Sequence, residues 1–137
     1  MPTYAAASIR NVAVVGHNGS GKTQLISALL FTAGATTRLG RVDDGTAPTD
    51  FDEEAIARKH TLAATPAWLD WQGTKINVVD TPGFGNFLGE TGAALRVTDA
   101  AVVVVDAVSG VEVQTERVWA LAGEQGLARF VVVNRLD

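Results

Sequence analysis

The stretch that decides the fold is Gly16-His17-Asn18-Gly19-Ser20-Gly21-Lys22-Thr23, which matches the pattern G-x-x-x-x-G-K-[ST]. A valine-rich run at residues 9–15 precedes it and predicts a buried strand. Residues 22–31 follow it, with leucine and isoleucine at helical spacing, and predict a helix. A glycine-rich turn between a strand and a helix is typical of a phosphate-binding loop. The alternative, a merely flexible turn, is disfavoured by this context.

The chemistry of such a loop follows from its residue types. Glycines allow the backbone to wrap around phosphates with successive N–H groups pointing inward, and the helix N-terminus adds partial positive charge. We expect all eight residues to contact a nucleotide, with Lys22 at the β- and γ-phosphates. The hydroxyl of Thr23 is expected to bind Mg²⁺.

The rest of the chain alternates between strand and helix patterns. Strands are predicted at residues 62–71, 75–79, 101–106 and 130–133, and helices at residues 86–97 and 112–125, the last ended by Gly126. Residues 34–60 are polar and turn-rich and predict a long loop, with a helical turn at 52–59. This order predicts the α/β P-loop NTPase three-layer sandwich, a mostly parallel sheet with one antiparallel edge strand. Ligands bind such sheets at the carboxyl ends of the strands.

Composition narrows the class of protein. The chain has 137 residues, of which 47% are hydrophobic and 19% charged, as in one compact domain. Its net charge is -4, and no basic run predicts a DNA or RNA surface. Cysteine is absent, which excludes disulfides and cysteine-bound metals. The apolar runs are too short to cross a membrane, so we expect a cytoplasmic protein with no DNA or membrane partner.

A second motif, Asp80-Thr81-Pro82-Gly83, directly follows the strand predicted at residues 75–79. A carboxylate at that position can hold Mg²⁺ through water, and the N–H of Gly83 can bond the γ-phosphate. A loop built in this way responds to the presence of that phosphate. On its own the tetrapeptide is equally well read as a plain turn.

A third motif, Asn134-Arg135-Leu136-Asp137, follows the strand predicted at residues 130–133 and looks like the guanine-binding pattern N-K-x-D. Asp137 would accept hydrogen bonds from N1–H and the 2-amino group of guanine, a donor pair that adenine lacks. Asn134 would bond the O6 and N7 edge and brace the phosphate loop. The stem and planar head of Arg135 can lie over the purine ring. The alternative is a polar cap at a strand end.

Three single residues are less decisive. Thr61 ends the long loop, where a threonine would complete the Mg²⁺ shell, but it is also readable as an ordinary strand or surface residue. For His17 and His60 we favour the reading of ordinary polar loop residues.

Longer stretches resemble the elongation factor G family. Arg58-Lys59-His60-Thr61-Leu62 is similar to its R-G-I-T-I segment, and Asp80-Thr81-Pro82-Gly83-Phe84 is similar to its D-T-P-G-H. Residues 95–102 and 106–116 are similar to the segments that follow in that family. The resemblance covers residues 9–137 and implies a translational GTPase that binds GTP or GDP with Mg²⁺ and acts on the ribosome. Residues 1–8 are then an N-terminal tail, and residues 9–137 a GTP-binding domain truncated after the guanine motif.

The chain departs from the family pattern at three positions. Phe84 stands where the family has the histidine that helps to align the attacking water, and phenylalanine can neither accept nor donate a proton. Gly19 replaces an aspartate, and Arg135 replaces the lysine of the guanine motif. The catalytic positions implied by the resemblance are Lys22, Gly83 and Phe84. We therefore expect slow hydrolysis, with a ring at position 84 that could restrict access to the γ-phosphate.

Three functions compete at this point. The first is a GTPase switch that hydrolyses GTP slowly and responds to ribosomes. The second is a module that binds guanine nucleotide without hydrolysing it, which Phe84 and the truncation favour. The third, a P-loop ATPase or kinase, is disfavoured by Asn134 and Asp137.

Overall fold

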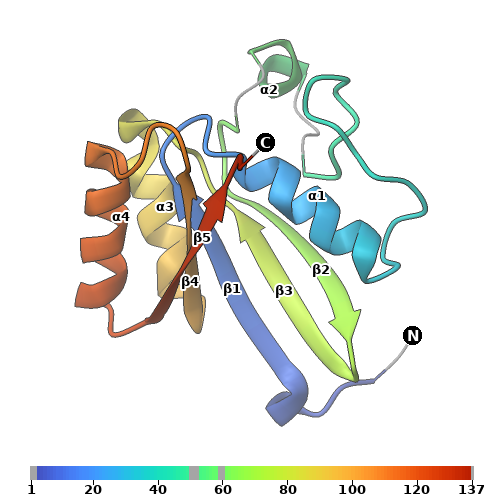
Figure 1. Cartoon of the computed structure of the whole chain (residues 1–137). Helices are drawn as coiled ribbons and strands as arrows, with labels where there is room; N and C mark the ends of the chain where they lie inside the picture. Colours follow the sequence, from blue (N-terminus) through green and yellow to red (C-terminus); the bar gives the residue numbers. More distant parts are fainter. Residues whose placement is uncertain (1–2, 50–52, 59–60, 137) are drawn as a thin grey trace.

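A computed structural model describes residues 3–49, 53–58 and 61–136. Their centre is a five-stranded sheet with the order β2-β3-β1-β4-β5. The strands are β1 (Ile9–Gly16), β2 (Thr65–Trp71), β3 (Thr74–Asp80), β4 (Ala100–Asp106) and β5 (Ala128–Asn134). All neighbours run parallel except β2, which pairs antiparallel with β3 at one edge. The predicted mostly parallel sheet with one antiparallel edge strand is confirmed (Figure 1).

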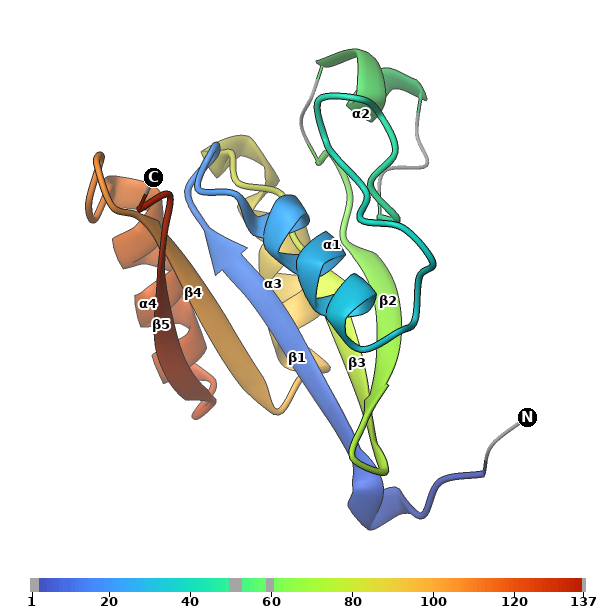
Figure 2. The same cartoon turned by 45° about the vertical axis from the view of Figure 1, so that its right-hand side comes forward.

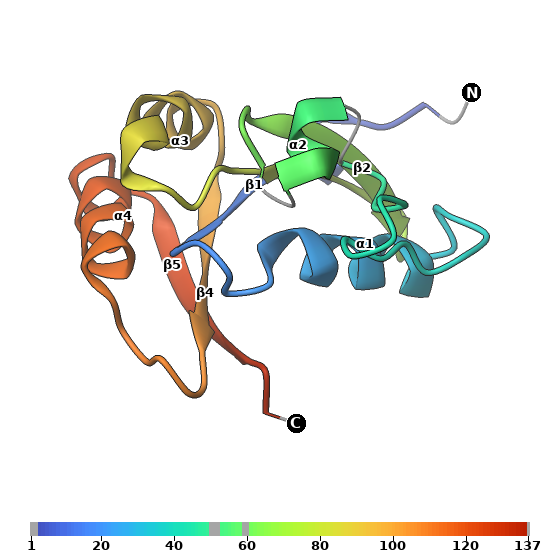
Figure 3. The same ribbon diagram turned by 90° about the horizontal axis from the view of Figure 1, so that it is seen from above.

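Helices cover both faces of this sheet. Helix α1 (Lys22–Thr32) lies on one face, while α3 (Leu88–Arg96) and α4 (Val113–Glu124) lie on the other (Figure 3). Successive side chains of a strand point to opposite faces, and β1 therefore supplies both cores. Val14 packs with Ile26 of α1, and Val15 packs with Leu95 of α3 and with α4. Two apolar layers on one sheet explain why the parallel strands read as continuous valine runs rather than as alternating ones.

The three predicted motifs meet at one end of the sheet. Val14 of β1 is in register with Asp80 of β3, and Asp106 of β4 is in register with Asn134 of β5. The carboxyl ends of these parallel strands, and the loops that follow them, therefore share one edge of the molecule. The short helix α2 (Glu53–Arg58) and its loop lie at the same end (Figure 2).

The opposite end of the sheet holds the start of the chain. A 3-10 helix, η1 (Ala6–Ser8), leads into β1. Before it, the Tyr4 hydroxyl donates a 2.7 Å hydrogen bond to the Asp70 carboxylate of β2. The division into a tail of residues 1–8 and a domain of residues 9–137 remains a prediction.

Most element ends differ from the expected ones by one or two residues, and two ends differ for clear reasons. Strand β2 begins at Thr65 rather than at residue 62, because Thr65 pairs with Asp80, the last residue of β3. The helix predicted from residue 86 begins as α-helix only at Leu88, after the 3-10 turn η2 (Gly85–Phe87). Gly126, with φ of 70°, follows α4 as predicted.

Candidate nucleotide-binding site

The phosphate loop requires glycine at two of its positions. Gly16 has φ of 146°, and a Cβ atom there would lie 2.4 Å from the backbone oxygen of Val104. Gly21 has φ of 89°, and its Cβ would lie 2.3 Å from Nδ2 of Asn134. A side chain is thus excluded both by the left-handed backbone and by close neighbours. The spacing of the motif reflects this packing between β1, β4 and the end of β5.

Lys22 is the cation of the site. It is buried, with 6% of its surface exposed, and its ammonium donates a 2.8 Å hydrogen bond to the backbone oxygen of His17 across the loop. Burial lowers its pKa to about 8, while the charge of Asp80 acts in the opposite direction. A buried cation at the start of a helix is well placed for an anion, since phosphate would restore the stabilisation that water provides.

On the other side of Lys22, hydroxyl groups gather around one carboxylate. Thr23 donates to Oδ2 of the buried Asp80 at 2.7 Å, and the hydroxyls of Thr23 and Thr61 lie 3.1 Å apart. The three residues predicted as magnesium ligands are therefore together. Carboxylate and hydroxyl oxygens are hard donors of the type that Mg²⁺ prefers, so this set fits the ion. Among the described residues no cluster of three histidine, aspartate or glutamate side chains could hold a metal.

Two residues of this site were missed by the sequence analysis. Thr49 is 2% exposed and donates a 2.9 Å hydrogen bond to Oδ2 of Asp80. Gln24 follows Thr23 and holds the long loop, donating to the backbone oxygen of Gly40 at 3.0 Å. It also accepts from the N–H of Val42 at 3.3 Å. Thr49 lies in the long loop and Gln24 contacts it, and this loop has no regular pattern of apolar residues. Only the tertiary structure therefore shows that both residues belong to the site.

The end of β5 reaches the phosphate loop from the other side. Nδ2 of Asn134 donates a 2.9 Å hydrogen bond to the backbone oxygen of Ser20, which is the expected brace. Arg135 has φ of 59°, and its guanidinium lies 3.5 Å from Oδ2 of Asp106. Hydrogen bonds from the N–H groups of Ser109 and Val108 hold the pKa of Asp106 below its usual value, so this carboxylate is charged. The contacts predicted with a guanine base stay predictions, and Asp137 lies outside the described residues.

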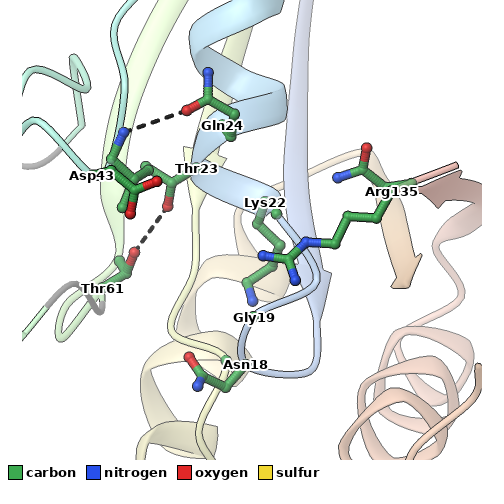
Figure 4. A pocket seen from close by; sticks show the side chains of 12 residues that line it. Asn18, Gly19, Lys22, Thr23, Gln24, Asp43, Thr61 and Arg135 are labelled. Carbon is green, nitrogen blue, oxygen red and sulfur yellow. Dashed lines mark hydrogen bonds between the residues drawn. The ribbon is translucent and has the colours of Figure 1, made fainter. Parts of the chain in front are cut away.

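These parts enclose a pocket of about 430 Å³, a suitable size for a small-molecule ligand (Figure 4). Besides the side chain of Lys22, residues of five segments line it: Asn18, Gly19, Gly21, Thr23 and Gln24; Val42 and Asp43; Thr61; Gly83; Asn134 and Arg135. The sequence motifs therefore do converge on one cavity.

Several predicted contact residues support the pocket without lining it, as far as the described part of the chain shows. Thr81 is buried and donates to the backbone oxygen of Val14 at 2.7 Å, and Pro82 accepts a 3.3 Å bond from Thr91. Gly16 and Ser20 are buried residues of the phosphate loop itself. Leu136 is 80% exposed.

Phe84 and His17 differ from the expectations. Phe84 is 37% exposed and lines a wider neighbouring cavity of about 670 Å³ instead of the phosphate pocket. Its ring therefore does not narrow that pocket in this structure. His17 is no ordinary loop residue, since it is 3% exposed. Its Nδ1 lies 3.4 Å from the Thr115 hydroxyl and its Nε2 lies 3.6 Å from the Glu112 carboxylate, because the tip of the loop packs against the start of α4. His60 lies outside the described residues.

A family model described as the elongation factor Tu GTP binding domain matches residues 7–137. The chain belongs to the family of elongation factor Tu GTP-binding domains. It is 41% identical over 137 residues to elongation factor G 2 of Streptomyces coelicolor, and this match covers 100% of the chain and 20% of that protein. It is 43% identical over 129 residues to an elongation factor G-like protein of Mycobacterium tuberculosis, over 94% of this chain and 18% of that protein. The resemblance to elongation factor G predicted from the sequence is confirmed.

A solved structure has the same fold as this chain. The crystal structure of a protein from Thermus thermophilus superimposes with a TM-score of 0.92 at 48% identity, over 96% of this chain and 20% of that one. The chain thus spans about a fifth of the length of its relatives. Among the described residues, no helix has the length and apolar character needed to cross a membrane.

Proposed function

We propose that this GTP-binding domain holds GTP or GDP with Mg²⁺ in the 430 Å³ pocket and hydrolyses GTP slowly as part of a ribosome-associated translation factor. The observation that carries the proposal is the convergence of three motifs on one cavity, with Lys22 buried at its floor and Asn134 bonded to the phosphate loop. Membership of the elongation factor family favours this function over an ATPase or a purely structural module.

Different residues would bind the phosphates, the magnesium ion and the base of the nucleotide. The glycine-rich backbone of residues 16–21 and Lys22 would hold the phosphates, and Gly83 would bond the γ-phosphate. The closeness of Gly83 to the phosphate loop supports this role, since a Cβ atom there would lie 2.6 Å from both the ammonium of Lys22 and the Cα of Asn18. Thr23, Thr61 and Asp80 would hold Mg²⁺, which when bound neutralises charge on the phosphates. Asn134, Arg135 and Asp137 would hold guanine.

The ribosome and the cytoplasm belong to the proposal through family membership alone. Slow turnover rests on Phe84, because phenylalanine stands where the family has the histidine that aligns the attacking water, and it can neither accept nor donate a proton.

The first test is base selectivity, measured by calorimetry with GDP, ADP and xanthosine diphosphate in the presence of Mg²⁺. We expect the protein to bind GDP and not ADP. Asp137→Asn replaces an acceptor by a mixed donor and acceptor, so GDP binding should weaken by about tenfold or more while xanthosine diphosphate gains. Leu136→Ala, next to it and exposed, is the matched control and should leave all three affinities unchanged. Equal binding of ADP and GDP would remove the guanine assignment.

A further inference from the structure

The long loop that precedes α2 contacts the candidate metal site through one buried side chain. Thr49 is 2% exposed, and its hydroxyl donates a 2.9 Å hydrogen bond to Oδ2 of Asp80. The same oxygen accepts the hydroxyl of Thr23 at 2.7 Å. A loop residue and the residue expected to bind the metal therefore share one carboxylate oxygen.

The hydroxyl groups of Thr49 and Thr61 contact the site in different ways. A threonine hydroxyl has one proton and two lone pairs. Thr23 gives its proton to Asp80, so in the 3.1 Å contact between Thr23 and Thr61 it is Thr61 that donates. That bond occupies one of the two lone pairs of Thr23. The bond from Thr49 ends on the carboxylate and leaves the lone pairs of Thr23 untouched. The Thr61 bond therefore uses one of the two lone pairs of Thr23 and leaves the other open to a cation, whereas the Thr49 bond uses neither.

A second contact keeps the loop in place independently of Asp80. Gln24 bonds the backbone of Gly40 and of Val42 on the first half of the loop, at 3.0 and 3.3 Å. The loop is therefore held on the first turn of α1 as well as on Asp80. Because the contacts of Gln24 remain, loss of the Thr49 hydroxyl should remove one of the bonds that orient the Asp80 carboxylate without detaching the whole loop.

We propose that Thr49 is a positioning residue for the magnesium site, holding the Asp80 carboxylate in the orientation that the hydrated cation needs. This inference rests on the proposed function. Groups that hold a metal-binding carboxylate by hydrogen bonds tune metal affinity strongly, and their removal often costs tenfold or more. Thr49 would then link the conformation of the loop to the affinity for Mg²⁺.

The experiment is a Mg²⁺ titration of GDP binding by the full chain, followed with a fluorescent GDP. Thr49→Val keeps the shape of the side chain and removes the hydroxyl, and we expect the half-saturating Mg²⁺ concentration to rise roughly tenfold. Thr49→Ser should restore the wild-type value, and Thr49→Ala should behave as Thr49→Val. GDP affinity in EDTA, without Mg²⁺, should be the same for all variants. A loss that is merely structural would lower the affinity in both conditions.

The matched control is Thr46→Val. Thr46 is in the same loop, but its hydroxyl bonds only the backbone of Arg41 among the described contacts, at 3.0 and 3.4 Å. Its Mg²⁺ titration should not move. The inference is overturned if Thr49→Val titrates like wild type, if Thr49→Ser fails to rescue, or if Thr46→Val gives the same shift. A wild-type protein that binds no GDP at any Mg²⁺ concentration would overturn the proposed function instead.

Discussion

Lys22 shows how burial makes a single residue depend on pH. The nucleotide-free pocket lowers its pKa to about 8, chiefly by desolvation. Phosphate beside the ammonium favours the charged form and raises the pKa again. Above pH 8, binding must therefore take up a proton, so GDP affinity should fall as pH rises from 7 to 9, approaching tenfold per pH unit at the upper end.

Calorimetry across this pH range, in buffers of different ionisation enthalpy, tests that proton uptake. Lys22→Ala should bind GDP at least about tenfold more weakly and should lose the pH dependence. The stability of the protein without nucleotide depends on pH in the opposite direction. Between pH 8 and 10.5 the unfolded lysine holds more proton than the folded one, so this contribution to the free energy of unfolding rises with pH. A flat affinity profile in the wild type would show that Lys22 is charged throughout.

Two glycines of the phosphate loop differ in how much space surrounds them. Gly19 and Gly21 have similar φ values of 82° and 89°, so alanine carries a similar backbone strain at both. Only at Gly21 would the new Cβ meet another group, Nδ2 of Asn134, whereas no atom of the described chain lies within 4 Å at Gly19. Gly21→Ala should therefore lower the melting temperature and GDP affinity more than Gly19→Ala.

The double variant Gly21→Ala with Asn134→Ala makes the comparison specific, with thermal unfolding as the measurement. Because the methyl group and the amide occupy the same space, their effects should be less than additive. Strict additivity would indicate that backbone strain alone makes glycine necessary at position 21.

The residues of the site could be predicted only where a local pattern marks them. Lys22, Thr23 and Asp80 stand in motifs whose chemistry is legible from neighbouring residues. Thr49 and Gln24 are ordinary polar residues in sequence, and their roles depend on a loop contact across 31 residues and one across 16 to 18. The burial of His17 could not be predicted, because it comes from α4, almost 100 residues later.

At the scale of an element, the first turn of α4 is capped by its own side chains and also contacts the phosphate loop. Glu112 and Thr115 form a capping box, in which the Thr115 hydroxyl accepts the N–H of Glu112 at 3.3 Å. The same hydroxyl lies 3.4 Å from Nδ1 of His17. Thr115→Val should lower the free energy of unfolding by about 1 kcal/mol, since one cap bond and one buried polar contact are lost.

Denaturant unfolding measures this effect, and Thr115→Ser, which retains the hydroxyl, is the control that should stay near wild type. A value for Thr115→Val equal to that of Thr115→Ser would show that the capping box contributes nothing measurable. If the contact with His17 also orders the phosphate loop, GDP affinity should fall along with stability.

Element types were predicted more reliably than their ends. The valine runs and the helical spacing of α1 and α4 depend on local side chains, and these elements were found where expected. The start of β2 depends on its partner instead. Leu62 has a strand-like side chain, but β3 ends at Asp80, opposite Thr65, so no partner strand is available to it.

At the scale of the whole molecule, strand order decides which motifs can meet. Placing β1 between β3 and β4, with β5 beyond β4, sets the phosphate loop between Asp80 and Asn134. The alternation of strands and helices predicts parallel neighbours, because these need helical crossovers, but the strand order itself comes from the structure. Beyond β4, β5 forms the outer edge of the described sheet, with Phe130, Val131 and Val133 about half exposed.

Phe84 lies between the phosphate loop and the outer surface of the molecule, where a ribosome could contact it. The adjacent cavity that it lines also includes Asn18 and Gly83, so a side chain at position 84 starts close to the phosphate pocket. Histidine there could turn toward a water molecule near Gly83, whereas phenylalanine cannot hold one. A positioned polar group in such a role typically contributes roughly 10²–10⁴-fold. We expect Phe84→His to raise GTP hydrolysis, most strongly with ribosomes, and to leave GDP affinity unchanged.

Single-turnover phosphate release, with and without ribosomes, measures this change, and Phe84→Leu is the control for loss of the ring alone. Leucine also cannot hold water, so it should hydrolyse GTP as slowly as the wild type. If both variants were faster, the bulk of the ring would be the limiting factor rather than the missing imidazole. If neither were faster, the water would have to be placed by another group. His17 is a poor candidate for that role, because its ring is buried between Thr115 and Glu112 and faces α4 rather than the phosphate pocket.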